Sequence, residues 1–186
     1  MTFSVVGRCA KTGMFGVAVS SSSPAVAARC AYTRAGIGAV ASQNVTDPSL
    51  GVRALDLLGM GLNAQEVIGV IARTAAHAQF RQVLVVDDAG GTAIHSGQRS
   101  LGIFTEALGD GVACAGNMLA NENVPRAMVD AFTSSEGHLG DRLIEVMRAA
   151  LRAGGEAGDV HSAGMQLARE VSWPVADLRV DWTEDC

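Results

Sequence analysis

The order in which strand-type and helix-type patterns follow one another is the feature that most constrains the fold of this chain. Short apolar runs predict strands at residues 3–9, 14–22, 36–43, 83–86, 92–95, 112–117, 162–169 and 176–183. Apolar residues at helical spacing predict helices at residues 48–59, 63–74, 122–133 and 139–153. The helices come in two antiparallel pairs, so the pattern does not match a winding in which single helices alternate with single strands.

Paired helices and strand hairpins each have one apolar side to bury, and a stack of helix and sheet layers buries all of these sides. We therefore predict a four-layer αββα sandwich of the α+β class. No repeat, low-complexity block or proline-rich linker divides the chain, which favours a single domain over residues 1–186. Apolar residues make up 48% of the sequence but aromatic residues only 4%, so the core should consist of small, closely spaced side chains.

Local signals support several of these boundaries. Gly13 can supply the positive φ of a tight turn between the first two strands. Residues 87–91, Asp-Asp-Ala-Gly-Gly, give a specific hairpin signal. Asn63 and Glu66 have the spacing of a capping box and predict the start of the second helix.

Charge and termini restrict the partners. Fourteen Lys and Arg against 19 Asp and Glu give a net charge of −5, which argues against a nucleic-acid or anionic membrane surface. The first residues lack the basic and apolar regions of a secretory signal, so we expect a cytoplasmic protein. The four cysteines, Cys9, Cys30, Cys114 and Cys186, are widely spaced and are expected to be reduced, buried thiols.

The sequence predicts neither a metal nor a cofactor. The histidines have no metal-ligand spacing with one another, with Cys or with Glu; they are His77, His95, His138 and His161. Gly36-x-Gly38-x-x-Ala41 imitates a dinucleotide-binding fingerprint, but residues 31–34 before it form a poor strand pattern and no helix opens inside it.

The beginning of the chain offers the first candidate for chemistry. Thr2 would become the first residue if Met1 were removed, and a small residue after the initiator methionine favours that removal. The hydroxyl of a free N-terminal threonine can attack a carbonyl carbon, while its α-amine, with a pKa of roughly 7.7–8.0, can accept the proton. Thr2 is therefore a candidate nucleophile that needs no separate histidine.

Six segments extend this interpretation because they occur together and in order. They are Thr2–Arg8, Gly16–Ser21, Arg34–Gln43, Asp47–Gly51, Arg81–Val83 and Gly116–Leu119. In these segments the chain resembles an uncharacterised Ntn-hydrolase-like family, the domain of unknown function numbered 1028. The resemblance implies an Ntn-hydrolase-like αββα domain and makes an amide-bond hydrolase the best functional hypothesis.

An N-terminal nucleophile needs donors for the oxyanion that forms about 3 Å from its hydroxyl. The side-chain amides of Asn117 and Asn44 are the best candidates, although either could be an ordinary turn asparagine. Gln43, next to Asn44 on the third predicted strand, is a candidate for substrate binding.

Three further residues are weaker candidates for substrate binding. Ser20 begins a serine run at a strand end, which could equally be a polar strand terminus. His95 could titrate near neutrality in a cleft or be a partly exposed strand histidine. Lys11 is the lone lysine and could lower the pKa of a nearby group, but a turn lysine usually points into water.

Two functional hypotheses follow. The first is an Ntn-type hydrolase of a small amide, carbamoyl or lactam-like substrate, an amidohydrolase with Thr2 as nucleophile and base. The alternative is a non-catalytic member of the same fold that binds a small metabolite or associates with itself, with Met1 retained. A homodimer is the expected oligomer in both cases.

Overall fold

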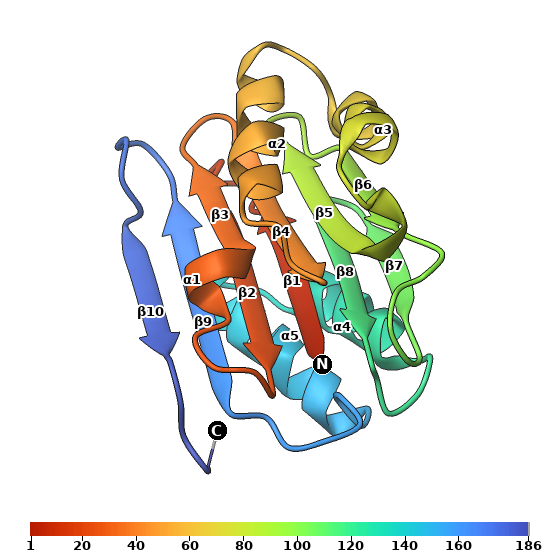
Figure 1. The fold of residues 1–186 in the computed structure, drawn as a ribbon. Coiled ribbons are helices and arrows are strands. Elements are labelled where there is room, and N and C mark those ends of the chain that lie inside the picture. Colours follow the sequence, from red (N-terminus) through yellow and green to blue (C-terminus); the bar gives the residue numbers. More distant parts are fainter. Residues whose placement is uncertain (186) are drawn as a thin grey trace.

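Two antiparallel sheets form the centre of the molecule (Figure 1). The computed structural model describes residues 1–185, so the expectation for the Cys186 thiol lies outside the described residues. The larger sheet has the strand order β10-β9-β2-β1-β8-β7: Ala176–Val180, Ser162–Ala168, Phe15–Ser21, Thr2–Arg8, Val112–Asn117 and Thr105–Gly109. The smaller sheet has the order β3-β4-β5-β6: Ala31–Arg34, Gly38–Asn44, Arg81–Asp87 and Thr92–Ser96.

Helix pairs cover the outer faces of the two sheets (Figure 1). The helices are α1 (Ala27–Cys30), α2 (Ser49–Gly59), α3 (Ala64–Thr74), α4 (Val124–Ser134) and α5 (Leu139–Arg152), with a 3₁₀ turn at Ala78–Phe80. The α4 and α5 side chains share one apolar core with the larger sheet, and those of α2 and α3 share another with the smaller sheet. The predicted four-layer αββα sandwich is therefore confirmed.

A third apolar core lies between the sheets and consists largely of alanine and valine. Strand β1 shows how the sequence divides its side chains between two cores. Phe3 and Val5 pack on the helix side, whereas Val6 packs between the sheets. Because successive side chains of a strand point to opposite faces, Thr2 and Ser4 also point between the sheets.

Several local predictions are confirmed. Asn63 and Glu66 form the capping box at the start of α3: the Glu66 N–H donates to Asn63 Oδ1 at 3.0 Å and the Asn63 N–H donates to Glu66 Oε2 at 2.9 Å. Gly13 has a φ of 70° in the turn between β1 and β2. The Asp87 carboxylate accepts the Ala89 and Gly91 N–H groups, which fixes the turn of the β5–β6 hairpin.

The interpretation of residues 31–34 as a poor strand is wrong. They form β3, which pairs with β4 from Ala31↔Ala41 to Arg34↔Gly38. All four side chains are half-buried, because β3 is an edge strand whose polar groups reach solvent, so the segment lacks the continuous apolar character of a central strand. Strand β7, also at an edge and alternately half-buried and exposed, has no predicted counterpart for the same reason.

Three further properties of residues 1–185 concern cysteines, metal ligands and membrane-spanning helices. Cys9, Cys30 and Cys114 are buried free thiols, as expected. Within this part of the chain no cluster of three or more potential metal ligands occurs. None of the helices described is both long and apolar enough to cross a membrane.

Candidate active site at the N-terminal end of the sandwich

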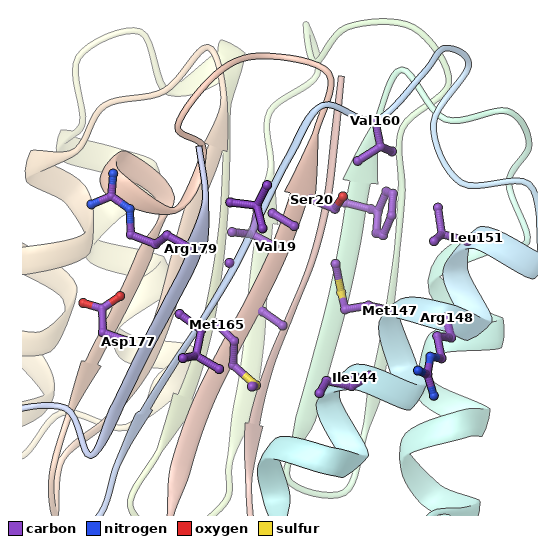
Figure 2. Close-up of a pocket in the computed structure, with 16 residues that line it drawn as sticks. Val19, Ser20, Ile144, Met147, Arg148, Leu151, Val160, Met165, Asp177 and Arg179 are labelled. Carbon is purple, nitrogen blue, oxygen red and sulfur yellow. The ribbon is translucent and has the colours of Figure 1, made fainter. Parts of the chain in front are cut away.

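A cavity of about 500 Å³ lies between α5 and strands β2, β9 and β10 (Figure 2). Its lining is mainly apolar and includes Phe3, Met147 and Met165, and Arg148 of α5 also contributes to its wall. This cavity is on the helix side of the larger sheet. It could hold an apolar group, but the Thr2 side chain points to the opposite face of β1.

Polar side chains gather instead at one end of the space between the sheets. We call this set the polar end: Thr2, Ser4, Ser21 and Asn117 on the larger sheet, and Gln43 and Gln82 on the smaller. All six are buried, and they lie at one end of the apolar core between the sheets. Buried polar groups do not increase stability over apolar ones of similar shape, so their concentration makes the polar end the candidate functional site.

Strand register places these residues together. In the antiparallel pairing of β1 with its two neighbours, Thr2 lies opposite Ser21 on β2 and opposite Asn117 on β8. In the smaller sheet Gln43 on β4 lies opposite Gln82 on β5. The start of β1 and β5 and the end of β2, β4 and β8 thus meet at one edge of the sandwich.

Amide side chains connect the two sheets at the polar end. Gln82 Oε1 accepts hydrogen bonds from Gln43 Nε2 at 2.7 Å and from Asn117 Nδ2 at 3.3 Å. Gln43 Nε2 also donates to the Ala115 carbonyl at 3.3 Å, and Gln82 Nε2 donates to the Gly116 carbonyl at 3.2 Å. Asn117 is therefore held in orientation by Gln82 from the facing sheet.

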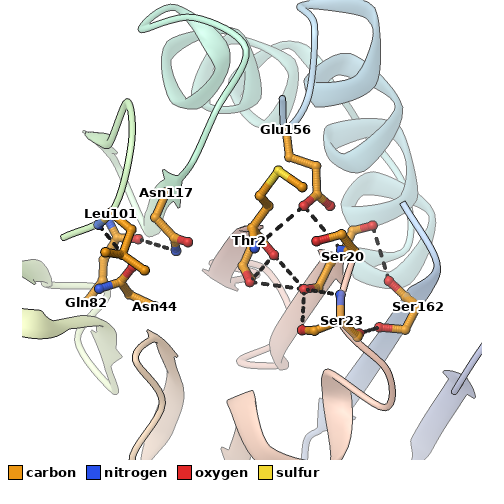
Figure 3. A network of polar contacts seen from close by, with 12 residues as sticks. Thr2, Ser20, Ser23, Asn44, Gln82, Leu101, Asn117, Glu156 and Ser162 are labelled. Atoms are coloured by element: carbon orange, nitrogen blue, oxygen red, sulfur yellow. Dashed lines mark hydrogen bonds and ion pairs between the residues drawn. The ribbon is translucent and has the colours of Figure 1, made fainter. Parts of the chain in front are cut away.

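Hydroxyl groups surround the peptide bond between Met1 and Thr2 (Figure 3). Thr2 Oγ1 and Ser21 Oγ each donate to the Met1 carbonyl at 2.5 Å, and the two hydroxyl oxygens are 3.2 Å apart. The Ser23 N–H donates to Ser21 Oγ at 3.1 Å, which fixes the position of the Ser21 side chain.

A buried carboxylate, Glu156, lies beside the N-terminal amine (Figure 3). Its side chain is fully buried, Oε2 accepts the Ser22 N–H at 3.1 Å, and the same oxygen is 4.0 Å from the Met1 nitrogen. Burial raises the pKa of Glu156 above its ordinary value. The backbone of Glu156 is held by a β-bridge to Leu119.

Unpartnered polar atoms concentrate in the same region. Five buried side-chain N or O atoms in residues 1–185 have no hydrogen-bond partner, and three of them are Ser4 Oγ, Gln43 Oε1 and Glu156 Oε1. Buried polar atoms are nearly always paired in folded proteins, so such a cluster requires an explanation. A ligand that supplies the missing donors and acceptors is one.

The structure brings together some of the sequence-predicted site residues and separates others. Thr2, Asn117 and Gln43 share the polar end. Ser20 lies at the same end of β2 but faces α5, with Oγ donating to the Ser162 carbonyl at 3.4 Å. The Asn44 side-chain amide donates to the Phe80 carbonyl and accepts a hydrogen bond from the Leu101 N–H. It therefore links the end of β4 to the 3₁₀ turn and to the segment that contains Leu101.

Two predicted residues lie away from Thr2. The His95 ring is on the face of β6 that packs towards α3 and is 2.9 Å from the Ala78 carbonyl oxygen. Lys11 is exposed in the turn at the opposite end of β1.

Sequence reasoning did not single out Gln82 or Glu156, and it included Ser21 only as a member of the serine run that begins at Ser20. For Ser21 a signal exists, because Val17, Val19 and Ser21 alternate along β2 and must share a face. For Gln82, the break from polar to apolar residues at the start of β5 is a weaker signal. Glu156 has none, since it lies in a loop after α5 where no periodicity applies.

Fold and site together define an αββα sandwich whose N-terminal strand begins at a buried polar cluster. The model of the family of unknown function DUF1028 matches residues 2–186, and the chain belongs to this family. The crystal structure of protein SPO2555 from Silicibacter pomeroyi, described with the same family, is similar with a TM-score of 0.91 and 25% identity over 99% of this chain and 82% of that one. Anbu, the ancestral beta-subunit from Yersinia bercovieri, aligns with a TM-score of 0.42 and 12% identity over 99% of this chain and 88% of its own. Among curated proteins none matches the chain.

Proposed function

We propose that this protein is an N-terminal-nucleophile hydrolase that cleaves a C–N bond in a small amide, carbamoyl or lactam-like substrate once Met1 has been removed. The observation that carries the proposal is the position of Thr2. Its side chain points into the polar end, with Ser21 Oγ at 3.2 Å and Asn117 opposite it on the neighbouring strand. The hydroxyl and the freed α-amine of the same residue would then lie inside a buried polar site.

After removal of Met1, the proposed reaction uses the hydroxyl and α-amine of Thr2 and the side chains of Asn117 and Ser21. The Thr2 hydroxyl attacks the substrate carbonyl, the α-amine takes the hydroxyl proton and passes it to the leaving amine, and water then hydrolyses the acyl ester. Asn117 is our candidate for the oxyanion donor. Its amide nitrogen carries two N–H groups, and only one of them is used in the 3.3 Å hydrogen bond to Gln82 Oε1, so the other can donate to the oxyanion. Once the Met1 carbonyl is gone, Ser21 Oγ, 3.2 Å from Thr2 Oγ1, is free to donate to it and orient the nucleophile.

The test compares chains released from a cleavable leader so that they begin either at Thr2 or at Met1. With a panel of small amides and carbamates, only the chain beginning at Thr2 should hydrolyse a substrate. Thr2→Ser should keep measurable activity, whereas Thr2→Ala should lose about 10³-fold or more in kcat/KM. Equal activity of Thr2→Ala and Thr2→Ser, or of the two starting points, would exclude Thr2 as the nucleophile.

A second candidate is a non-catalytic protein of the same family that binds an apolar metabolite or associates with itself. The apolar cavity between α5 and the larger sheet favours the binding role. Exposed apolar side chains on the edge strand β10, Leu178 and Val180, favour a homodimer. We also propose that the protein acts in the cytoplasm. In this alternative, ligand binding would not differ between the Thr2-first and Met1-first chains.

A further inference from the structure

The side chain, the α-amine and the carbonyl group of Met1 each contact the protein at the end of the sandwich. Its side chain is only 24% exposed. Its α-amine nitrogen is 4.0 Å from Glu156 Oε2, and its carbonyl accepts hydrogen bonds from the hydroxyls of Thr2 and Ser21. Its thioether end lies against Gly158, where an added Cβ would be 2.7 Å from Met1 Cε. An amino group, a carbonyl group and an unbranched side chain therefore each have a defined place.

Glu156 is the unusual member of this arrangement. A fully buried carboxylate is unfavourable unless it has a cationic or hydrogen-bonding partner, and its Oε1 has none among residues 1–185. Its Oε2 faces the N-terminal amine. Removal of Met1 takes away the side chain and carbonyl that occupy this place, while Glu156, Ser21 and Gly158 stay with the rest of the chain.

We infer that the place of Met1 becomes the acyl subsite of the enzyme after Met1 has been removed, and that the subsite takes an α-aminoacyl group with a free amine. The inference rests on the proposed function. In this arrangement the substrate ammonium binds Glu156, its carbonyl lies beside the hydroxyls of Thr2 and Ser21, and an unbranched side chain lies along Gly158. The substrate class is accordingly a small aminoacyl amide.

The reaction needs only the substrate and water. A bond forms between Thr2 Oγ1 and the acyl carbon, and the C–N bond of the substrate breaks. The hydroxyl proton moves through the Thr2 α-amine to the leaving amine. Water then cleaves the ester, so the products are a free amino acid and an amine, and the Thr2 hydroxyl is restored.

Binding tests the subsite separately from catalysis. A Thr2→Ala chain beginning at residue 2 cannot use a hydroxyl nucleophile, and calorimetry would measure its affinity for L-methioninamide and for N-acetyl-L-methioninamide. We expect the acetylated probe to bind about 10- to 100-fold more weakly, because it has lost the charge that faces Glu156. A Met1-first chain should not bind L-methioninamide, since Met1 already occupies the subsite.

Two substitutions identify the residues responsible. Glu156→Gln should weaken L-methioninamide binding by about 10- to 100-fold and leave the acetylated probe nearly unchanged. Asp159→Asn, an exposed acid three residues along, is the matched control and should have no effect. Gly158→Ala narrows the side-chain space and should weaken L-methioninamide more than glycinamide; it also provides a test if Glu156→Gln fails to fold.

The outcomes separate this inference from the proposed function. Equal affinity for the free and acetylated probes, or no binding of L-methioninamide to folded protein, would overturn the subsite. If Thr2-dependent hydrolysis of an uncharged amide persisted in that case, the proposed hydrolase would stand without it. Selective, Glu156-dependent binding without any Thr2-dependent hydrolysis would support the subsite and refute the hydrolase.

Discussion

Replacing Gln82 by methionine tests whether the amides of the polar end depend on one another. Methionine has a similar length and no amide. Gln82→Met therefore deprives the Asn117 amide and the Gly116 carbonyl of their partner and removes the shorter of the two hydrogen bonds made by Gln43 Nε2. Each buried group left unsatisfied costs about 1–3 kcal/mol and the lost Gln43 bond costs about 0.5–1.5 kcal/mol, so the total cost is about 2.5–7.5 kcal/mol. The more apolar side chain returns about 1–2 kcal/mol, so the free energy of unfolding should fall by about 0.5–6.5 kcal/mol.

Urea denaturation followed by circular dichroism measures this change. Gln98→Met, at an exposed position, is the control and should alter the free energy of unfolding by less than about 0.5 kcal/mol. The double variant with Gln43→Met should lose less than the sum of the single variants, because Gln43 Nε2 no longer needs the acceptor that Gln82 provided. A Gln82→Met variant as stable as the parent would refute the hydrogen-bonded arrangement.

Two further predictions concern stability. Burial raises the pKa of Glu156, so the folded protein retains a proton that the unfolded chain has released. The contribution of Glu156 to stability is therefore fully present below its ordinary pKa of 4.5 and is lost as the pH rises through the folded value. Thermal melting across this range should show a smaller fall for Glu156→Gln, and identical pH profiles would contradict the burial of this acid. Leu84→Ala, in the fully buried core between the sheets, should reduce the free energy of unfolding by about 2–5 kcal/mol in urea denaturation. A loss under about 1 kcal/mol would show that the two sheets are not tightly packed there.

The fold was largely predictable because each element carries its own pattern. Strand β8 has the bounds 112–117 that its apolar run predicts, and the capping box fixes where α3 begins. Two of the four edge strands, β3 and β7, have no predicted counterpart, whereas the edge strands β6 and β10 were predicted. The side chains of β3 and β7 are only partly buried, so these strands lack the continuous apolar run of a central strand.

The site was predictable only in part, because it depends on contacts between distant segments. Thr2 and Asn117 could be nominated by residue type, but their juxtaposition depends on the register between β1 and β8. The hydrogen bond from Gln43 to Gln82 joins strands whose pairing no local signal specifies. Glu156 reaches the N-terminus from a loop, and its burial could not be read from the polarity of its neighbours.

The most direct test of the central claim is the intact mass of the protein purified from its native host. If Thr2 is the nucleophile, the mass is lower than that of the full chain by one methionine residue, and terminal sequencing gives Thr2 as the first residue. A mass that includes Met1 in all of the protein would leave the Thr2 amine in a peptide bond and contradict the proposed mechanism.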